Sequence, residues 1–413
     1  MRRVLLVTRG CYLDSSNGAS IASRAMMEAL ARQGFAAEAL SGMRFEHGRE
    51  VDPDAWLAGV GIPFETVGGD SWSIDARGLR AKTPLHHRLT VVGVSVTLAR
   101  HAGADELEMK GSECEEFIRL YDAILKRFQP EVLVSYGSDW LSREVRSRAR
   151  NQGAIVVFPL HNCSYDDAGP FASADAVMVP SPFAAHYYRE NLGLDCAVLS
   201  NLVDWDRIRA ETRDPRFVTF VNPSYEKGVY AFVRIADELG RLRPDIPLLV
   251  VESRGSERTV VDCGIDLRPH GTVHLMEHTD DPRHFWSVTR LCLMPSLAPE
   301  TQGLAAVEAM ANGIPVIVSD RGALPETVGG AGLVLPLPDD LTPFTRSLPA
   351  PEDVAHWVEA IIRLWDDSAF YTEQQQRARA ESRRWAPEVL EPRYARFFQQ
   401  VRRRPELQTA PSS

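Results

Sequence analysis

The chain has 413 residues, of which 44% are hydrophobic and 25% are charged, and its formal net charge is −10. This length exceeds one ordinary core, so we expect two domains, and the composition is that of a globular protein. The acidic balance argues against a nucleic-acid partner, which needs a basic surface, but it allows one local basic pocket for a phosphate.

The N-terminus and the cysteines indicate where the protein works. Arg9 interrupts the first apolar stretch, so this stretch is too short for a signal peptide, and no uninterrupted apolar run reaches about 18 residues. The six cysteines lie far apart without a CxxC pair, which favours buried reduced thiols over a zinc site or a disulfide framework. We therefore expect a cytoplasmic protein.

Short apolar strands alternate with amphipathic helices through the first half of the chain. Strands are predicted over 4–8, 131–136, 154–160, 176–180 and 196–200, and helices over 19–33 and 113–128. Apolar runs this short and this continuous are typical of parallel strands that are covered on both faces.

The same alternation returns after a polar, charged stretch at 204–216, which we interpret as the interdomain linker. Strands are predicted over 217–221, 248–252, 272–276, 291–295, 316–319 and 332–336, and helices near 228–242, 282–289, 303–312 and 353–366. The pattern predicts an α/β protein with two Rossmann-like domains, each a doubly wound parallel sheet.

Three segments do not follow this pattern. Residues 43–112 mix glycine, proline, histidine and charged residues with weak strand signals, and we expect loops there. Residues 338–351 are rich in proline and predict a surface excursion, and the polar last ten residues predict a frayed tail.

The stretch 294–328 carries the strongest functional signal. A loop with Glu300 leads into a helix that opens near Gly303, and Glu308 follows inside that helix. Free backbone N–H groups at 301–304 favour an anion such as a diphosphate, and a carboxylate accepts hydrogen bonds from sugar or ribose hydroxyls. A pair of glutamates taken alone is more often a solvated helix start.

The surrounding string, Pro-x4-Glu-x2-Gly-Leu-x3-Glu-Ala-Met-Ala-x-Gly-x-Pro-Val, resembles almost position for position the donor-binding signature of retaining glycosyltransferase family four, the glycosyl transferases group 1 with the GT-B fold. The resemblance implies that Glu300 contacts hydroxyls of the transferred sugar and that Glu308 holds the ribose. It also implies that four backbone amides lie against the sugar and the diphosphate, those of Thr301, Gln302, Gly303 and Leu304. The family more often has Gly-Phe at the positions of Thr301 and Gln302, where sugar identity is read.

A second match lies at 217–239, where a strand, a short loop and Lys227-Gly228 resemble the family's phosphate-binding turn. The resemblance implies that Lys227 neutralises the leaving diphosphate. Many relatives have an arginine five residues earlier, where this chain has Asn222, so one positive charge of the usual pair is missing.

Two further features are expected on the N-terminal side of the cleft. The loop 8–26 follows the first strand, and its Gly18 resembles part of the family's glycine loop, although the pattern is not GxGxxG. His161 ends a strand and resembles the family's cleft histidine, which contacts the donor sugar near the reacting carbon; a structural loop histidine is the alternative. Asp166 and Asp167 are acceptor-side candidates, with a solvated loop as the alternative.

The resemblance spans nearly the whole chain, and 385–401 resembles the family's closing helix, which crosses back to the first domain. We therefore predict an acceptor-side domain over 1–205 plus 388–413 and a nucleotide-sugar-binding domain over 206–387. The predicted reaction retains configuration, needs neither a metal nor a cofactor, and uses a UDP- or GDP-sugar carrying a hexose. The alternatives are an epimerase or phosphorylase on the same fold and a non-catalytic binding protein.

The acceptor is left open among a saccharide, a lipid-linked molecule and a small molecule. The basic run 402–404 is the one hint of weak contact with a membrane surface. The sequence carries no signal for the oligomeric state.

Overall fold

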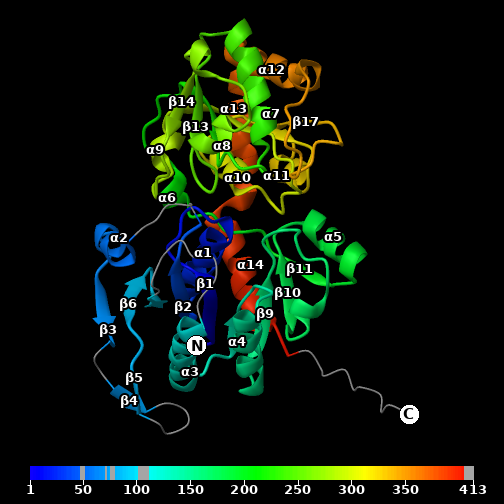
Figure 1. Cartoon of the computed structure of the whole chain (residues 1–413). Coiled ribbons are helices and arrows are strands. Elements are labelled where there is room, and N and C mark those ends of the chain that lie inside the picture. Colours follow the sequence, from blue (N-terminus) through cyan, green and yellow to red (C-terminus); the bar gives the residue numbers. More distant parts are fainter. Residues whose placement is uncertain (47–51, 70–71, 75–79, 101–110, 404–413) are drawn as a thin grey trace.

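The structure is a computed structural model that describes residues 1–46, 52–69, 72–74, 80–100 and 111–403. These residues form two α/β domains, one above the other in Figure 1, each built around its own sheet. The predicted fold class, two Rossmann-like domains that face a cleft, is confirmed. No helix in the described part of the chain is long and apolar enough to cross a membrane.

The N-terminal sheet has, within the described residues, the strand order β11-β10-β9-β8-β1-β2-β7-β6-β3. Its strands are β1 (Arg3–Gly10), β2 (Ala36–Arg44), β3 (Phe64–Val67), β6 (His86–Val91), β7 (Val94–Ala99), β8 (Val132–Val134), β9 (Ile155–Pro159), β10 (Ala176–Val179) and β11 (Cys196–Val198). All neighbours pair in parallel except β6, which is antiparallel to both β3 and β7. The five strands predicted in this half are all present.

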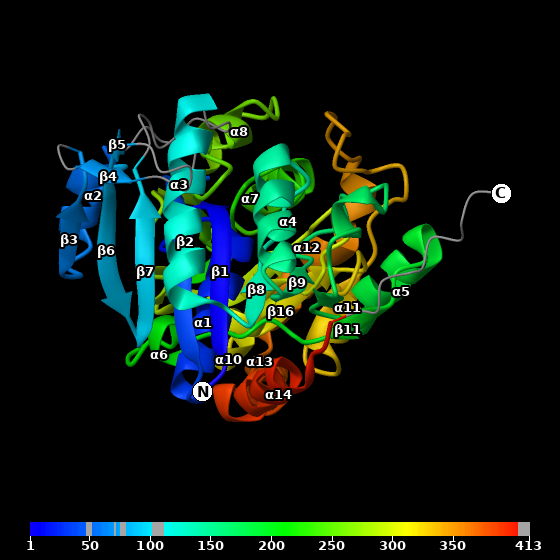
Figure 2. The same cartoon turned by 90° about the horizontal axis from the view of Figure 1, so that it is seen from below.

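Helices cover both faces of this sheet (Figure 2). They are α1 (Gly18–Arg32), α3 (Gly111–Phe128), α4 (Trp140–Asn151) and α5 (Pro182–Leu192). Side chains alternate along β1, so that Val4 and Leu6 pack in the core that includes α1 while Leu5 and Val7 pack in the core of α3, α4 and α5. This two-sided burial explains why the strand reads as a continuous apolar run.

The C-terminal sheet has the order β14-β13-β12-β15-β16-β17 across the residues described, with every neighbouring pair parallel. Its strands are β12 (Phe217–Val221), β13 (Leu248–Val251), β14 (Val273–Met276), β15 (Thr289–Met294), β16 (Val316–Ser319) and β17 (Leu333–Leu335). Its helices are α7 (Val229–Leu242), α8 (Glu257–Val261), α9 (Arg283–Trp286), α10 (Leu304–Ala311), α11 (Leu324–Val328), α12 (Pro351–Asp366) and α13 (Ser368–Ser382). The six strands and four helices predicted here are confirmed, with ends that differ by a few residues.

The chain returns to the N-terminal domain in its last helix, α14 (Pro387–Gln400), which is drawn in red in the lower domain of Figure 1. This helix packs on α1, and Arg32 Nη2 lies 2.6 Å from Glu391 Oε1. Tyr394 and Phe398 of α14 are buried. The predicted closing helix is therefore confirmed.

The predicted linker, 204–216, contains the short helix α6 (Trp205–Ile208) and runs between the last strand of one sheet and the first of the other. Its second half lies against the C-terminal domain, because the amide of Ala210 donates to Asn312 Oδ1 and Arg213 donates to the carbonyl of Asn312. The proposed domain boundaries at 205/206 and 387/388 stay predictions.

Residues 43–112 differ from the loops that we expected. Besides β3, β6 and β7, this region contains α2 (Pro53–Gly59) and the antiparallel pair β4 (Trp72–Ile74) and β5 (Arg80–Lys82). The strand signal is weak because histidines occupy buried positions, among them His87, whose ring contacts Thr66 Oγ1 and Asp54 Oδ1 at 3.0 Å each.

Several sequence predictions fall partly outside the described residues. These are the remainder of 43–112, the polar tail, and Arg404 of the basic run. The predicted surface excursion at 338–351 has no regular secondary structure before α12 begins, and all six cysteines are free thiols.

Candidate functional site

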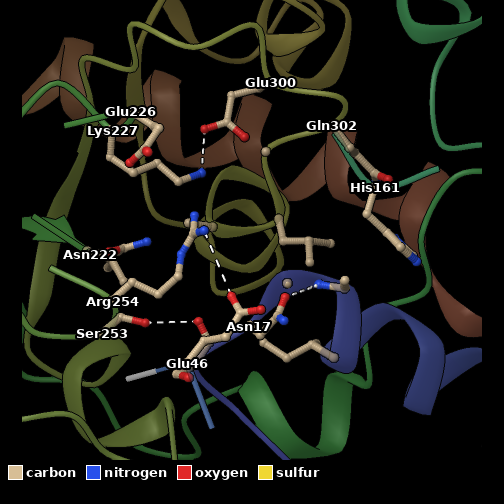
Figure 3. Close-up of a pocket in the computed structure, with 18 of the residues that line it drawn as sticks. Asn17, Glu46, His161, Asn222, Glu226, Lys227, Ser253, Arg254, Glu300 and Gln302 are labelled. Carbon is tan, nitrogen blue, oxygen red and sulfur yellow. Dashed lines mark hydrogen bonds and ion pairs between the residues drawn. The ribbon is translucent and has the colours of Figure 1, made fainter. Parts of the chain in front are cut away.

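A cavity of about 920 Å³ lies between the two domains. Its walls are loops that follow β1 and β9 of the N-terminal sheet and β12, β13 and β15 of the C-terminal sheet, which is where open parallel sheets bind ligands (Figure 3). Every predicted site residue lines this cavity: Gly18, His161, Asn222, Lys227, Glu300, Thr301, Gln302, Gly303, Leu304 and Glu308. Asp166 and Asp167 are exposed and do not line it, although Ser164 and Tyr165 do.

Glu300 and Lys227 meet at the centre of the C-terminal wall (Figure 3). Lys227 Nζ lies 2.5 Å from Glu300 Oε1, and the Ser296 hydroxyl donates to the same oxygen at 2.9 Å. The structure thus joins the two motifs that the sequence separates by 73 positions. Each of these two charges neutralises the other.

Close packing of backbone brings these two motifs together. Gly228 has a φ of 81°, and a Cβ at this position would lie 1.8 Å from the carbonyl oxygen of Pro295. The carbonyl of Glu226 accepts hydrogen bonds from the amides of Leu297 and Ala298. The lysine turn therefore lies directly on the loop that carries Glu300, and only glycine fits at position 228.

Glu308 lies within α10, whose N-cap is Gly303 with a φ of 80°. Its side chain is buried, and Oε2 accepts a hydrogen bond of 3.0 Å from the indole nitrogen of Trp286. Burial raises the pKa of Glu308 to about 7, and the Trp286 indole offsets part of this rise. Further hydrogen-bond donors, such as a pair of ribose hydroxyls, would stabilise a buried carboxyl that has only one donor.

His161 stands on the opposite wall, just beyond the end of β9. Its Nε2 is buried without a hydrogen-bond partner, and its ring packs edge-on against Tyr136 with 5.0 Å between ring centroids. Burial lowers the pKa of His161 to about 4, so the imidazole is neutral at neutral pH. A neutral imidazole can exchange a hydrogen bond with a sugar hydroxyl but brings no charge.

Thr301 and Gln302 connect the two domains. The Thr301 hydroxyl donates to the carbonyl of His161 at 2.9 Å, and Gln302 Oε1 accepts from the amide of Asn201 at 2.7 Å. Gln302 Nε2 is buried without a partner. Both side-chain oxygens are thus bonded to the N-terminal domain, and the expected role of the two residues in reading sugar identity stays a prediction.

Asn222 and Gly18 differ in how tightly they are held. Asn222 has a φ of 62°, and its Oδ1 accepts a hydrogen bond of 2.9 Å from the amide of Gly255. Gly18 begins α1, and a Cβ there would meet Leu304 Cδ1 at an ordinary 3.7 Å. The packing therefore leaves space at Gly18, and its approach to a phosphate stays a prediction.

The sequence interpretation missed polar residues that line the same cavity, among them Glu46, Glu226 and Arg254. Arg254 follows the end of β13, a strand that was predicted. The rule that ligands bind at the carboxyl ends of parallel strands could have found it. Glu46 follows β2, which was not predicted, and so carried no usable signal.

Three comparisons with known proteins bear on this site. Residues 215–367 match the family described as "Glycosyl transferases group 1". The chain is 27% identical over 225 residues to a lipopolysaccharide 1,2-N-acetylglucosaminetransferase of Salmonella typhimurium, in an alignment that covers 48% of this chain and 57% of that relative. The chain therefore spans little more than half the length of this curated relative.

Solved structures match over nearly the whole chain. Sucrose-phosphate synthase from Thermosynechococcus elongatus has a TM-score of 0.65 at 18% identity, with 97% of this chain and 99% of that chain covered. The pneumococcal O-GlcNAc transferase GtfA, in complex with UDP and GlcNAc, has a TM-score of 0.65 at 10% identity, with 97% and 99% covered. Anabaena HepE, in complex with UDP and glucose, has a TM-score of 0.63 at 14% identity, with 97% and 100% covered.

At these identities the solved structures establish the fold, and the family match lies on the domain that carries Lys227, Glu300 and Glu308. The resemblance predicted from the sequence is confirmed: the chain has the GT-B fold, and residues 215–367 match the glycosyl transferases group 1.

Proposed function

We propose that the protein is a retaining glycosyltransferase that moves a hexose-type sugar from a nucleoside diphosphate sugar to an acceptor. The observation that carries the proposal is the contact of Lys227 with Glu300 beside the N-terminus of α10, inside the region that matches the family. A cation, free helix amides and a carboxylate within one pocket suit a ligand that joins a diphosphate to a polyhydroxylated ring.

The proposed donor binds by replacing contacts between side chains of the pocket. Lys227 would leave Glu300 for the diphosphate, and Glu300 would then accept hydrogen bonds from sugar hydroxyls. Glu308 would receive the ribose hydroxyls, and His161 would face the sugar from the other domain. The two catalytic charges thus become available only when the donor is present.

In the proposed transfer, the bond between the anomeric carbon and the diphosphate oxygen breaks, and the acceptor oxygen bonds to that carbon on the same face. The acceptor hydroxyl gives its proton to the departing phosphate oxygen. Negative charge grows on the diphosphate as the bond breaks, and Lys227 with the α10 amides stabilises it. Enclosure between the domains excludes the water that would hydrolyse the donor. This route needs no metal ion.

The comparison proteins support the choice of ligands. HepE and GtfA were solved with UDP together with a sugar, and the Salmonella relative is an N-acetylglucosaminetransferase. We propose a UDP- or GDP-sugar as donor and a saccharide, a lipid-linked molecule or a small molecule as acceptor. A cytoplasmic location and weak membrane contact through the basic run stay predictions.

A donor screen followed by one variant tests the proposal. Thermal shift with UDP-, GDP- and ADP-sugars should raise the melting temperature with one of them, because a ligand of the native state stabilises it. With that donor, Glu300→Gln should lower transfer to a screened acceptor by roughly 10²–10³-fold, the scale of losing one transition-state contact. Undiminished transfer by Glu300→Gln would show that the active site is assigned wrongly.

The same screen separates the alternatives. An epimerase would convert the donor sugar without releasing nucleoside diphosphate, and a phosphorylase would need inorganic phosphate. A non-catalytic binding protein would bind the donor and leave it unchanged with every acceptor.

A further inference from the structure

Arg254 gives the cavity a further cation on its C-terminal wall, which Lys227 and Arg346 also line. It lies in the loop between β13 and α8, its side chain is 44% exposed, and it lines the cavity with Lys227 (Figure 3). The resemblance described in the sequence analysis implies an arginine in the lysine turn, at the position of Asn222. The missing charge is therefore present in the same pocket, on a neighbouring strand end.

The loop that carries Arg254 is fixed to the turn that carries Asn222. The amide of Gly255 donates to Asn222 Oδ1 at 2.9 Å. A Cβ at Gly255 would lie 2.2 Å from the carbonyl carbon of Pro223, so the two backbones are in direct contact. Asn222 adopts a φ of 62°, a conformation that asparagine tolerates better than most residues. Asn222 thus places Arg254 instead of providing a charge itself.

One carboxylate from each domain, Glu46 and Glu226, lies near this arginine. Arg254 Nη1 lies 3.9 Å from Oε2 of Glu46, which belongs to the N-terminal domain. Burial raises the pKa of Glu226, but its own backbone amide, the Ser224 hydroxyl and the charges of Arg254 and Lys227 bring that pKa below its ordinary value. Glu226 therefore lies within the field of both cations.

The loop also touches the N-terminal domain beside the predicted phosphate approach. The Ser253 hydroxyl donates to the carbonyl of Ser16 at 3.0 Å, two residues before Gly18. A diphosphate held by Lys227 and the α10 amides would lie between this loop and the Gly18 loop. Arginine is suited to such a position because its planar, permanently charged guanidinium binds phosphate oxygens in pairs.

We propose that Arg254 binds the donor diphosphate together with Lys227, that Asn222 positions it, and that Glu46 competes with the diphosphate for it. The proposal rests on the proposed function, because it assumes a nucleoside diphosphate donor. The two positive charges on the diphosphate, Lys227 and Arg254, would then come from the loops after two neighbouring strands. The family resemblance implies that both charges lie on one turn. Donor binding then breaks the Arg254–Glu46 contact between the domains.

The first test compares UDP with uridine by calorimetry on the full chain, with GDP and ADP and their nucleosides in parallel. Arg254→Met should weaken nucleoside diphosphate binding about 10- to 100-fold, the scale of a charge-assisted contact, and leave nucleoside binding unchanged. Arg258→Met is the matched control: Arg258 lies on α8, is 89% exposed and does not line the cavity, so its removal should change neither affinity. Arg254→Gln repeats the test if Arg254→Met fails to fold.

The second test asks whether replacing Glu46 raises or lowers the affinity for the nucleoside diphosphate. Glu46→Gln removes the competing carboxylate and should tighten diphosphate binding several-fold. In an Arg254→Met background, Glu46→Gln should have no such effect, because the two residues act on each other. Asn222→Ala should weaken diphosphate binding in the wild-type background and have little effect once Arg254 is replaced.

The outcomes separate this proposal from the proposed function. If none of the three nucleoside diphosphates binds the wild-type protein, the proposed function itself fails. If the wild type binds one and Arg254→Met binds it equally well, the proposed function stands and the role of Arg254 is wrong. Weakening of nucleoside and diphosphate binding to the same extent would show that Arg254 only supports the fold of its loop.

Discussion

The two walls of the cleft are built in different ways. On the C-terminal wall, loops lie backbone to backbone: Gly228 on Pro295, Gly255 on Pro223, and Gly322 on Glu300, where a Cβ would come within 2.4 Å. On the N-terminal wall, Gly18 makes only ordinary contacts, and His161 is tied to the other domain through its carbonyl. One wall is fixed by its own packing, whereas the other depends on contacts across the cleft.

The largest expected effect tests the packed wall. Gly228→Ala should destabilise the protein by about 4 kcal/mol or more, because alanine combines a strained φ with overpacking against the Pro295 carbonyl. Chemical unfolding followed by circular dichroism measures the loss, and hydrogen exchange in β12 and β15 should locate it in the C-terminal sheet.

Gly18→Ala is the matched control on the other wall. Its new Cβ would meet Leu304 at van der Waals distance, so stability should change by less than about 0.5 kcal/mol. Equal losses from both glycine variants would remove the contrast between the walls.

The next effect concerns the buried acid of the packed wall. The folded-state pKa of Glu308 is raised to about 7 from an ordinary 4.5, so the native state holds this proton more tightly than the unfolded chain. This group's contribution to stability is complete below about pH 4.5 and is lost as the pH rises to about 7. Glu308→Gln stays neutral and should therefore be more stable than the wild type above pH 7, by up to about 3 kcal/mol.

Melting temperatures of both proteins from pH 4.5 to 8 check this prediction. The difference should vanish at the acidic end of that range. A loss of stability in Glu308→Gln that is the same at every pH would mean that the carboxyl is ionised in the fold.

The smallest effect tests the contact across the cleft. Thr301→Val removes the hydroxyl that donates to the His161 carbonyl and should cost about 1 kcal/mol, the net worth of one hydrogen bond. Faster hydrogen exchange around His161 should accompany this loss. Thr301→Ser keeps the hydroxyl and should behave like the wild type; if serine and valine act alike, the methyl packing of Thr301 matters and the hydrogen bond does not.

The fold was largely predictable because both sheets are parallel and buried on two faces. Val4–Val7 of β1 are all apolar, and Thr219 is the one polar residue of β12, so the sequence shows these strands directly. The edge of the N-terminal sheet was not predictable, because the buried His87 of β6 satisfies its polarity through Thr66 and Asp54, which are distant in the chain. A buried residue of this kind looks like a loop residue until its partners are known.

The candidate site divides in the same way. Glu300, Gly303 and Glu308 lie at fixed spacing in one strand-loop-helix unit, so the sequence alone places them together. Arg254 and Glu46 reach the cavity from separate strand ends, and only the order of the strands brings them near Lys227. The contacts of Thr301 and Gln302 with the other domain were likewise not predictable, because residue spacing within one segment does not show which residues of the other domain lie opposite it.

Helix α14 has a consequence for the order in which the protein folds as it is synthesised. Leu390 and Phe398 belong to the same apolar core as Val4 and Leu30, and Arg2 donates hydrogen bonds to the carbonyls of Phe398 and Val401. The N-terminal domain thus emerges first from the ribosome but lacks part of its core until residue 400 has been made. The C-terminal sheet, contained in one continuous stretch, can form earlier, which reverses the usual order for domains of a growing chain. A nascent chain stalled before α14 would leave the apolar face of α1 uncovered, open to aggregation or to a chaperone.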